Sequence, residues 1–200
     1  MILDFPKTKK LRIFTVEDDF DFAYLIQTTL NREKDMTVVG HAASEKEALF
    51  KLSSLPVDLV LMDLNLSSSP SDGILAGRHI RLKTDAKLVI LTAYEEPATI
   101  IEACKQSFAS GYIFKSHFEA LPENLRRMAT GATPQLALIR SLILSDLSAA
   151  EQSVLNLMLG AKITLRSSSK TISNQKNSIL RKLGLRNQEE LIHLFRHYLL

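Results

Sequence analysis

The sequence has little of several residue types that mark common protein classes. Cys104 is the single cysteine, which excludes an intramolecular disulfide framework and any cysteine-based zinc site. Tryptophan is absent and aromatic residues make up only 6% of the chain, which argues against an aromatic-lined carbohydrate or nucleotide cleft. The longest apolar runs, such as residues 59–62, are far shorter than the roughly 18 residues that a membrane span needs. The first seven residues lack the pattern of a signal peptide, so we expect a cytoplasmic protein.

The chain does contain enough apolar residues for stable cores. Hydrophobic residues make up 46% and charged residues 24% of its 200 residues, which suits one large folded domain or two small ones. Up to residue 130, short runs rich in Val, Ile and Leu alternate with amphipathic stretches, as in buried parallel strands joined by helices. Five such units predict an α/β fold, a doubly wound five-stranded parallel sheet. The expected strands are Leu11–Val16, Met36–Ala42, Asp58–Met62, Lys87–Thr92 and Gly111–Phe114; the expected helices are Phe22–Asn31, Glu45–Leu52, Gly73–Lys83, Pro97–Gln106 and Leu121–Met128.

Residues 131–134, Gly-Ala-Thr-Pro, break this pattern and form the expected domain boundary. The pattern after them is all-helical, which predicts a small second domain. The expected helices are Gln135–Leu144, Ala149–Leu159, Ser169–Leu183 and Gln188–Leu199. Capping patterns support the helix ends: Ser44 with Glu47, Ser148 with Glu151, Asn187 with Glu190, and the glycines Gly160 and Gly184.

Charge is unevenly distributed along the chain. Residues 1–140 hold 17 basic and 18 acidic residues, whereas residues 141–200 hold eight basic and four acidic ones. No acidic residue lies between Glu151 and Glu189, but seven basic ones do: Lys162, Arg166, Lys170, Lys176, Arg181, Lys182 and Arg186. A stretch of one sign favours a polyanionic partner, and a basic helix that faces only solvent is the alternative on charge alone.

Polar residues follow the predicted strands where ligands bind in open parallel sheets, beyond the carboxyl ends. They are Glu17, Asp18 and Asp19 after the first strand, Asp63 after the third, Thr92 at the end of the fourth and Lys115 after the fifth. Clustered carboxylates suit Mg²⁺, and a carboxylate beside a metal and a lysine can act as a nucleophile toward phosphorus. A threonine hydroxyl and a lysine can bind phosphoryl oxygens. Any one of these residues alone is explained as a cap of the next helix.

Four motifs at these strand ends resemble the receiver domain of two-component response regulators, a flavodoxin-like fold. The motifs are Val16-Glu17-Asp18-Asp19, Leu61-Met62-Asp63-Leu64-Asn65, Leu91-Thr92-Ala93 and Gly111-Tyr112-Ile113-Phe114-Lys115. The resemblance implies that Asp63 accepts a phosphoryl group from a sensor histidine kinase. It also implies a Mg²⁺ site formed by Asp18, Asp63 and the backbone carbonyl of Asn65, with Glu17 acting through water. Thr92 and Tyr112 form the implied switch pair, and the protein is expected to be a phosphoacceptor with slow autodephosphorylation only, not an enzyme.

The C-terminal part resembles the LuxR-type helix-turn-helix of the NarL/FixJ response regulators. The resemblance rests on residues 147–151 (Leu-Ser-Ala-Ala-Glu), 168–172 (Ser-Ser-Lys-Thr-Ile) and 179–184 (Ile-Leu-Arg-Lys-Leu-Gly). It implies a receiver at residues 8–130, a linker with a helix at 131–146 and a DNA-binding output domain at 147–200. The residues expected at double-stranded DNA are Ser173, Asn174 and Asn177 at the bases, Lys170 and Thr171 near the backbone, and Arg181 at phosphate or guanine.

One difference between this sequence and the family pattern leads to two alternative functions. Gly160 and Thr171 are 11 residues apart, about five fewer than the family pattern has, so most of the scaffold helix before the recognition helix is missing. A phosphorylation-controlled DNA-binding regulator is the leading hypothesis; a receiver whose shortened output domain binds a protein is the alternative. A phosphohydrolase of the haloacid-dehalogenase kind is disfavoured, because its nucleophile sits on the first strand and because Asn65 replaces its second aspartate.

The last predicted helix carries six large apolar residues: Leu191, Ile192, Leu194, Phe195, Tyr198 and Leu199. In the resembled family this helix often makes a dimer contact. A role in the core of the domain explains the same residues equally well, so a homodimer remains an expectation.

Overall fold

A computed structural model describes residues 9–66, 70–131, 133–164 and 167–195. Its contacts divide the chain into two compact units between Thr133 and Pro134. Within the described residues, no helix combines the length and the apolar character that crossing a membrane requires.

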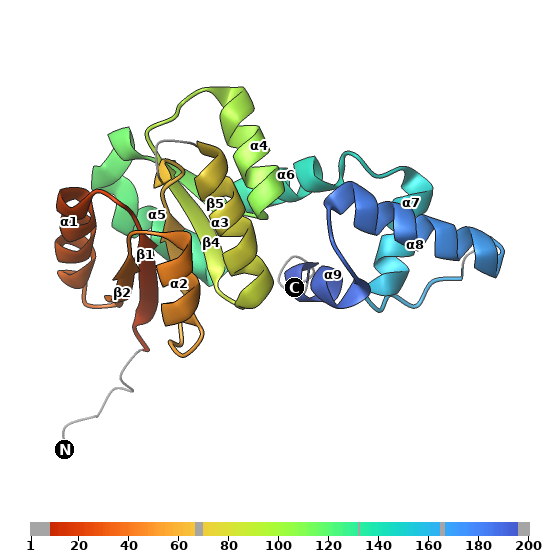
Figure 1. The fold of residues 1–200 in the computed structure, drawn as a ribbon, viewed down its shortest axis with the longest axis horizontal. Coiled ribbons are helices and arrows are strands. Elements are labelled where there is room, and N and C mark those ends of the chain that lie inside the picture. The colour runs from red at the N-terminus through yellow and green to blue at the C-terminus, as the bar shows by residue number, and fades with distance from the viewer. Residues whose placement is uncertain (1–8, 67–69, 132, 165–166, 196–200) are drawn as a thin grey trace, which may run out of the picture. The chain divides into compact units, whose positions relative to one another are not determined.

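The first unit is built on one parallel sheet (Figure 1). Its strands run in the order β2-β1-β3-β4-β5. This order confirms the predicted α/β fold class. The direction of winding reverses between β1 and β3, and open α/β sheets bind ligands at such a switch point. The strands are β1 (Leu11–Val16), β2 (Met36–Ala42), β3 (Leu59–Met62), β4 (Lys87–Thr92) and β5 (Gly111–Phe114).

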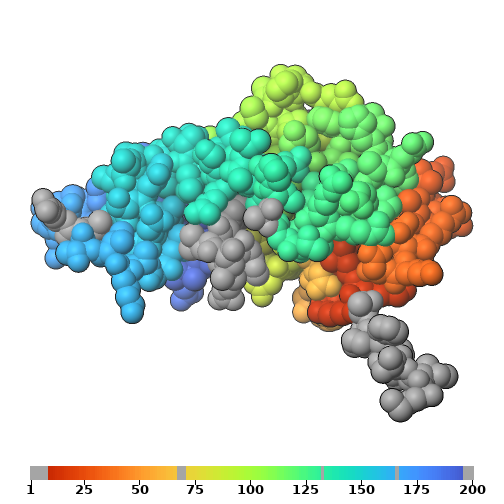
Figure 2. Space-filling model, turned by 180° about the vertical axis from the view of Figure 1, so that it is seen from behind, coloured from red at the N-terminus to blue at the C-terminus, as the bar shows by residue number. Residues whose placement is uncertain are grey.

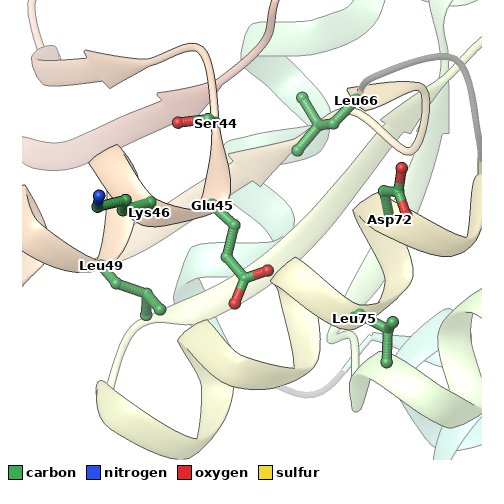
Figure 3. Close-up of a pocket in the computed structure, with 7 residues that line it drawn as sticks. All are labelled: Ser44, Glu45, Lys46, Leu49, Leu66, Asp72 and Leu75. Carbon is green, nitrogen blue, oxygen red and sulfur yellow. The ribbon is translucent and has the colours of Figure 1, made fainter.

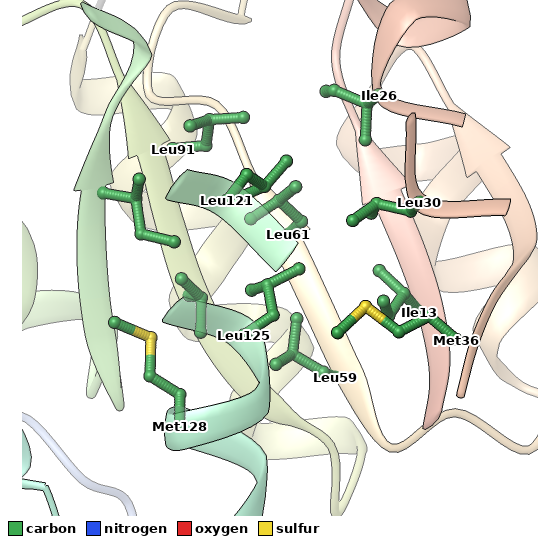
Figure 4. Close-up of a cluster of buried hydrophobic side chains, with 12 residues drawn as sticks. Ile13, Ile26, Leu30, Met36, Leu59, Leu61, Leu91, Leu121, Leu125 and Met128 are labelled. Atoms are coloured by element: carbon green, nitrogen blue, oxygen red, sulfur yellow. The ribbon is translucent and has the colours of Figure 1, made fainter. Parts of the chain in front are cut away.

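Helices cover both faces of the sheet, which explains why the strands are apolar on both sides. The helices α1 and α5 pack on one face, and α2, α3 and α4 pack on the other (Figure 1). Figure 4 shows the core beneath α1 and α5, where Ile26 and Leu125 meet strand residues such as Ile13 and Leu61. The helices are α1 (Phe20–Asn31), α2 (Glu45–Leu52), α3 (Pro70–Lys83), α4 (Pro97–Ser107) and α5 (Leu121–Thr130).

Ion pairs close the outer surface of this face. Arg126 on α5 donates to Asp35, with Nε 2.7 Å from Oδ2, and also pairs with Glu33. These contacts join α5 to the turn that follows α1. Figure 2 looks onto this side, where the green surface of α5 lies near the orange surface of the first elements. Apolar packing beneath α5 and ion pairs at its outer surface therefore hold this helix against the sheet and the end of α1.

Several element boundaries differ by one to three residues from those that the sequence predicted, and one element was not predicted. Helix α1 starts at Phe20, two residues early, because Asp19 caps it and accepts a hydrogen bond from the Phe22 amide at 3.0 Å. Helix α3 starts at Pro70, not at Gly73, since a proline in the first turn needs no amide partner. A 3₁₀ helix, η2 (Lys115–Ala120), follows β5 where the sequence predicted no element.

The second unit is helical in its described residues. Ser148 and Glu151 form the predicted capping box at α7, and Gly160 (φ +94°) and Gly184 (φ +63°) adopt the left-handed conformations expected after helices. The Glu190 carboxylate accepts from the Arg186 amide rather than from Asn187, so the predicted box at α9 is only half formed. The helices are α6 (Pro134–Leu144), α7 (Ala149–Met158), α8 (Ser169–Leu183) and α9 (Gln188–Phe195). Residues 196–200 of the last predicted helix lie outside the described residues.

Candidate functional site

Three carboxylates converge at the carboxyl edge of the sheet, where β1 and β3 are neighbours. Glu17 and Asp18 follow β1, and Asp63 follows β3; one carboxylate oxygen from each lies within 4.8 Å of the others. Glu17 is 2% exposed and Asp63 is 4% exposed, whereas Asp18 faces solvent. Asp19 lies outside this cluster and caps α1 instead. The site is therefore a pocket of buried negative charge with one open side.

Lys115 supplies the opposing charge from the end of β5. Its Nζ donates to Glu17 Oε2 at 2.8 Å and to Asp63 Oδ2 at 2.9 Å, and it lies 4.2 Å from the centre of the Phe22 ring. The sequence separations are 98 and 52 residues, so only the sheet topology brings these groups together. Of the residues predicted at this site, the structure places Glu17, Asp18, Asp63 and Lys115 in one cluster.

Burial and hydrogen bonding shift the pKa values of Glu17 and Lys115 in this cluster. Burial raises the pKa of Glu17 to about 7, opposed by its hydrogen bond from Lys115 and reinforced by the negative charge of Asp63. Burial lowers the pKa of Lys115, but the hydrogen bonds to Glu17 and Asp63 outweigh it, and the pKa is raised overall. The raised pKa of Lys115 keeps the lysine charged, whereas the raised pKa of Glu17 favours its protonated form.

The donor set fits Mg²⁺. Asp63 Oδ1 is buried and has no hydrogen-bond partner in the described part of the chain, although its other oxygen binds Lys115. A buried carboxylate oxygen without a partner is costly unless a cation binds it. Hard oxygen donors with one open, solvated side are what Mg²⁺ prefers, because it retains several waters.

Thr92 and Tyr112 lie on the same side of the sheet. Thr92 is fully buried at the end of β4 and pairs with Phe114 in the strand ladder, and Tyr112 pairs with Ile90 two residues earlier. The Thr92 hydroxyl accepts a hydrogen bond from the Tyr94 amide at 3.0 Å. The Tyr112 ring is half-buried beside Phe114, with ring centres 5.4 Å apart. The arrangement leaves Tyr112 at the rim of the sheet rather than in the core.

Two residues near Asp63 were missed by the sequence predictions. The Tyr94 hydroxyl donates a long hydrogen bond, 3.4 Å, to Asn65 Oδ1, which joins the loops after β3 and β4. Gly73, inside α3, packs directly on the backbone of Leu64: a Cβ at position 73 would lie 2.4 Å from the Leu64 carbonyl oxygen. The sequence places Gly73 at the start of the predicted helix, and no pattern in the sequence indicates its contact with Leu64.

A second candidate region is the outer face of α8. All six residues predicted at DNA are exposed there: Lys170, Thr171, Ser173, Asn174, Asn177 and Arg181. Ile179 and Leu183 are buried on the opposite face, while Ile172 and Leu180 are half-buried. Residues 161–164, 167 and 168 between α7 and α8 contain no helix, and 165–166 lie outside the described residues. The described connection therefore lacks a scaffold helix, as the short spacing predicted.

A buried glutamate fixes α8 to α7 in place of that helix. Glu151 is 6% exposed, binds Lys182 and Ser178 at 2.7 Å each, and accepts from the Ser148 amide at 2.8 Å. The hydrogen bond from Lys182, helped by those from Ser148 and Ser178, lowers the pKa of Glu151 to about 2. The sequence predicted the cap but gave no sign of the pair with Lys182, which lies 31 residues further on. A groove of about 410 Å³ remains between Ser148 and the Thr171–Ser178 side of α8.

We expect Glu151→Gln to destabilise the α7–α8 pair by about 2 kcal/mol at neutral pH, because an amide replaces a carboxylate that accepts charged and neutral donors. The folded pKa of about 2 lies below the value of about 4.3 for an unfolded chain, so this stabilisation is complete above about pH 5. It is lost as pH falls toward 2. Hydrogen exchange of α7 and α8 amides in the full chain measures it. The exposed Glu189→Gln is the control, and a wild-type advantage that persisted at about pH 2 would contradict the assignment.

A further hollow of about 560 Å³ lies between α2 and α3 (Figure 3). Glu45 and Lys46 line it from α2, and Asp72 and Leu75 line it from α3. Glu45 Oε1 lies 2.5 Å from Nδ1 of His79 on α3. None of the strand-end carboxylates lines this hollow, so it is separate from the acidic site.

Known proteins share both parts of this architecture. A family model described as the response regulator receiver domain matches residues 13–126. The uncharacterized transcriptional regulatory protein YvfU of Bacillus subtilis is 28% identical over 190 residues, which cover 90% of this chain and 94% of that protein.

Solved structures extend the likeness to the fold. A two-component response regulator of the LuxR family from Aurantimonas sp. SI85-9A1 is 27% identical with a TM-score of 0.56, over 69% of this chain and 98% of that one. RcsB from Salmonella enterica serovar Typhimurium, bound to promoter rprA with phosphomimetic BeF3-, is 23% identical with a TM-score of 0.56, over 94% and 99%. At 23% identity the second likeness concerns the fold alone.

Proposed function

The chain belongs to the response regulator receiver family, and from this premise we propose that Asp63 accepts a phosphoryl group and that the second unit responds by binding DNA. The observation that carries the proposal is the convergence of Glu17, Asp18 and Asp63 with Lys115 at the switch point of the sheet. These residues supply a nucleophile, a cation-binding oxygen set and a fixed positive charge within one pocket.

Asp63, Asp18 and the Asn65 carbonyl are the proposed Mg²⁺ ligands, with Glu17 acting through water. The ion supplies charge neutralisation for the phosphoryl oxygens and the attacking carboxylate. An Asp63 carboxylate oxygen bonds to phosphorus as the bond to the donor imidazole of a sensor histidine kinase breaks, and that electron pair returns to the ring. Lys115 already lies 2.9 Å from Asp63 and neutralises a phosphoryl oxygen. We propose no turnover of a substrate beyond slow autodephosphorylation.

Thr92 and Tyr112 form the proposed switch. The Thr92 hydroxyl exchanges its contact with the Tyr94 amide for a phosphoryl oxygen, and Tyr112 moves from the rim toward the space that the threonine leaves. Phosphorylation shifts the equilibrium between two receiver conformations only if the phosphoryl group makes more favourable contacts in one conformation than in the other. The domain roles proposed are a receiver at residues 8–130, a linker with α6 at 131–146 and an output domain at 147–200. We also propose that the chain forms a homodimer through α9. It acts in the cytoplasm, where both the kinase and the DNA are accessible.

We expect the full chain to bind duplex DNA with an affinity that falls steeply with salt, because basic residues at phosphates release counterions. The slope of log affinity against log salt is about −0.9 for each phosphate contact. Fluorescence anisotropy across a salt series, with and without prior treatment with acetyl phosphate and Mg²⁺, measures it. Absence of binding at low salt in both forms would refute the DNA-binding part.

The missing scaffold helix favours one second candidate, a shortened output domain that binds a protein. The groove beside α8 is open and lined by hydroxyls, amides and the Glu151–Lys182 pair, which suits a polar segment of a partner. This function is supported if the phosphorylated full chain ignores DNA at low salt while Asp63 still takes the phosphoryl group.

A further inference from the structure

Lys115 contacts an aromatic ring as well as the two carboxylates of the acidic site. Its ammonium has three N–H donors, and two of them bind Glu17 Oε2 and Asp63 Oδ2. The ring of Phe22 lies on a further side, with Lys115 Nζ over it at 4.2 Å from the ring centre. A cation at this distance is attracted by the negative face of the ring. The lysine side chain is only 21% exposed, which strengthens this attraction because little water competes with it.

The early start of α1 brings Phe22 to this place. Asp19 caps the helix, so α1 begins at Phe20 and Phe22 belongs to its first turn. The Phe22 amide donates to Asp19 Oδ1 at 3.0 Å, which holds the backbone of this turn. The ring therefore extends from a fixed backbone that directly follows the acidic residues at the end of β1.

The 3₁₀ helix η2 holds the ring from the other side. It carries Lys115 at its first residue and Phe118 three residues later, and both side chains contact the Phe22 ring. The two phenyl rings are tilted by 56° with their centres 5.4 Å apart, an arrangement that aromatic pairs favour. Both rings also pack on the hydrophobic core beneath α1 and α5. Phe22 is therefore held by Phe118 and the core while it meets the ammonium.

We propose that Phe22 is a positioning residue for phosphoryl transfer to Asp63, and that its ring holds the Lys115 ammonium where the phosphoryl group arrives. A lysine side chain is long and flexible, so its charge stabilises a transition state best when the ammonium is already in place. During the reaction the ammonium turns from Asp63 toward a phosphoryl oxygen. Its contacts with Glu17 and the ring do not involve Asp63, so they can persist during that turn. This inference rests on the proposed phosphorylation of Asp63 and adds a residue that acts through Lys115.

The test compares Phe22→Leu with Phe22→Tyr in the full chain, by the initial rate of hydroxylamine-sensitive labelling from acetyl phosphate with Mg²⁺. Leucine keeps an apolar side chain but has no aromatic face, so labelling should slow about 2- to 30-fold, the range for one lost cation–π contact. Tyrosine keeps the aromatic face, so Phe22→Tyr should react within about twofold of the wild type. Phe20→Leu makes the same change at a phenylalanine of α1 that is 77% exposed. It is the matched control and should react like the wild type.

A spectroscopic measurement reports the contact itself. In protein that contains isotope-labelled lysine, the ε-methylene protons of Lys115 should resonate upfield of those of other lysines, because they lie close to the face of the Phe22 ring. Lys115→Arg identifies the signal by removing it. The upfield shift should persist in Phe22→Tyr and disappear in Phe22→Leu. A residue that only filled space would produce no such shift.

The outcomes separate this inference from the function beneath it. Labelling of Phe22→Leu at the wild-type rate, an absent upfield shift, or a Phe22→Tyr variant as slow as Phe22→Leu overturns the inference and leaves phosphorylation of Asp63 intact. Equal slowing of Phe20→Leu also overturns it, since that assigns the effect to α1 as a whole. A wild-type chain that takes no hydroxylamine-sensitive label refutes the proposed function, and the inference falls with it.

Discussion

Asp63→Asn should abolish phosphorylation of this protein by acetyl phosphate. The substitution keeps the size of the side chain but removes the negative charge that makes the carboxylate a nucleophile toward phosphorus and a ligand of the cation. Asp63 Oδ1 is the one buried oxygen of this cluster without a partner in the described residues, which marks Asp63 as the carboxylate available to the cation and the phosphoryl group. Incorporation of labelled phosphoryl groups, and its removal by hydroxylamine, measures an acyl phosphate directly.

Asp58→Asn is the matched control for this experiment. Asp58 immediately precedes β3 as Asp63 immediately follows it, and its carboxylate binds Arg12, with Oδ1 2.8 Å from Nη2. This variant loses an ion pair at the opposite end of the same strand, so it should be labelled like the wild type. Hydroxylamine-sensitive labelling of Asp63→Asn at the wild-type level would refute the assignment of Asp63, and mapping would then decide between Glu17 and Asp18.

The sequence predicted the sheet well because its strands are buried on both faces. Continuous Val, Ile and Leu runs differ clearly from the amphipathic helices between them, and the five predicted strands occur within one residue of their expected bounds. The helix starts were less predictable, since they depend on single residues. Asp19 caps α1, and α3 begins at Pro70. The sequence alone is equally consistent with both residues lying in the preceding loops.

The acidic site was predictable for a topological reason. Every residue placed there follows a strand, and parallel strands bring their carboxyl ends to one edge, so Glu17, Asp63 and Lys115 had to be close. No comparable rule predicts the pairing of Glu151 with Lys182. Helix packing in the second unit decides which two faces meet, and a charged pair 31 residues apart leaves no periodic trace in the sequence.

Gly73→Ala should destabilise the first unit by about 3 kcal/mol and weaken Mg²⁺ binding at the acidic site. The added Cβ would lie 2.4 Å from both Cα and the carbonyl oxygen of Leu64, which are backbone atoms that no rotamer change can move. Alanine favours a helix over glycine by about 1 kcal/mol, so a loss of stability here must come from the clash. Leu64 joins Asp63 to Asn65, so any shift of this segment displaces two of the proposed ligands.

Gly77→Ala tests whether the effect belongs to this one contact. It introduces the same methyl group one turn later in α3, where the nearest atom is Leu88 Cδ2 at 2.9 Å, the end of a flexible side chain. The control should therefore cost far less stability and leave Mg²⁺ affinity unchanged. Urea unfolding followed by circular dichroism gives the stability, and titration with Mg²⁺ gives the affinity. Equal stability of the two variants would show that the backbone of α3 does not rest on Leu64. Lower stability with unchanged Mg²⁺ affinity would show that the segment after Asp63 tolerates displacement.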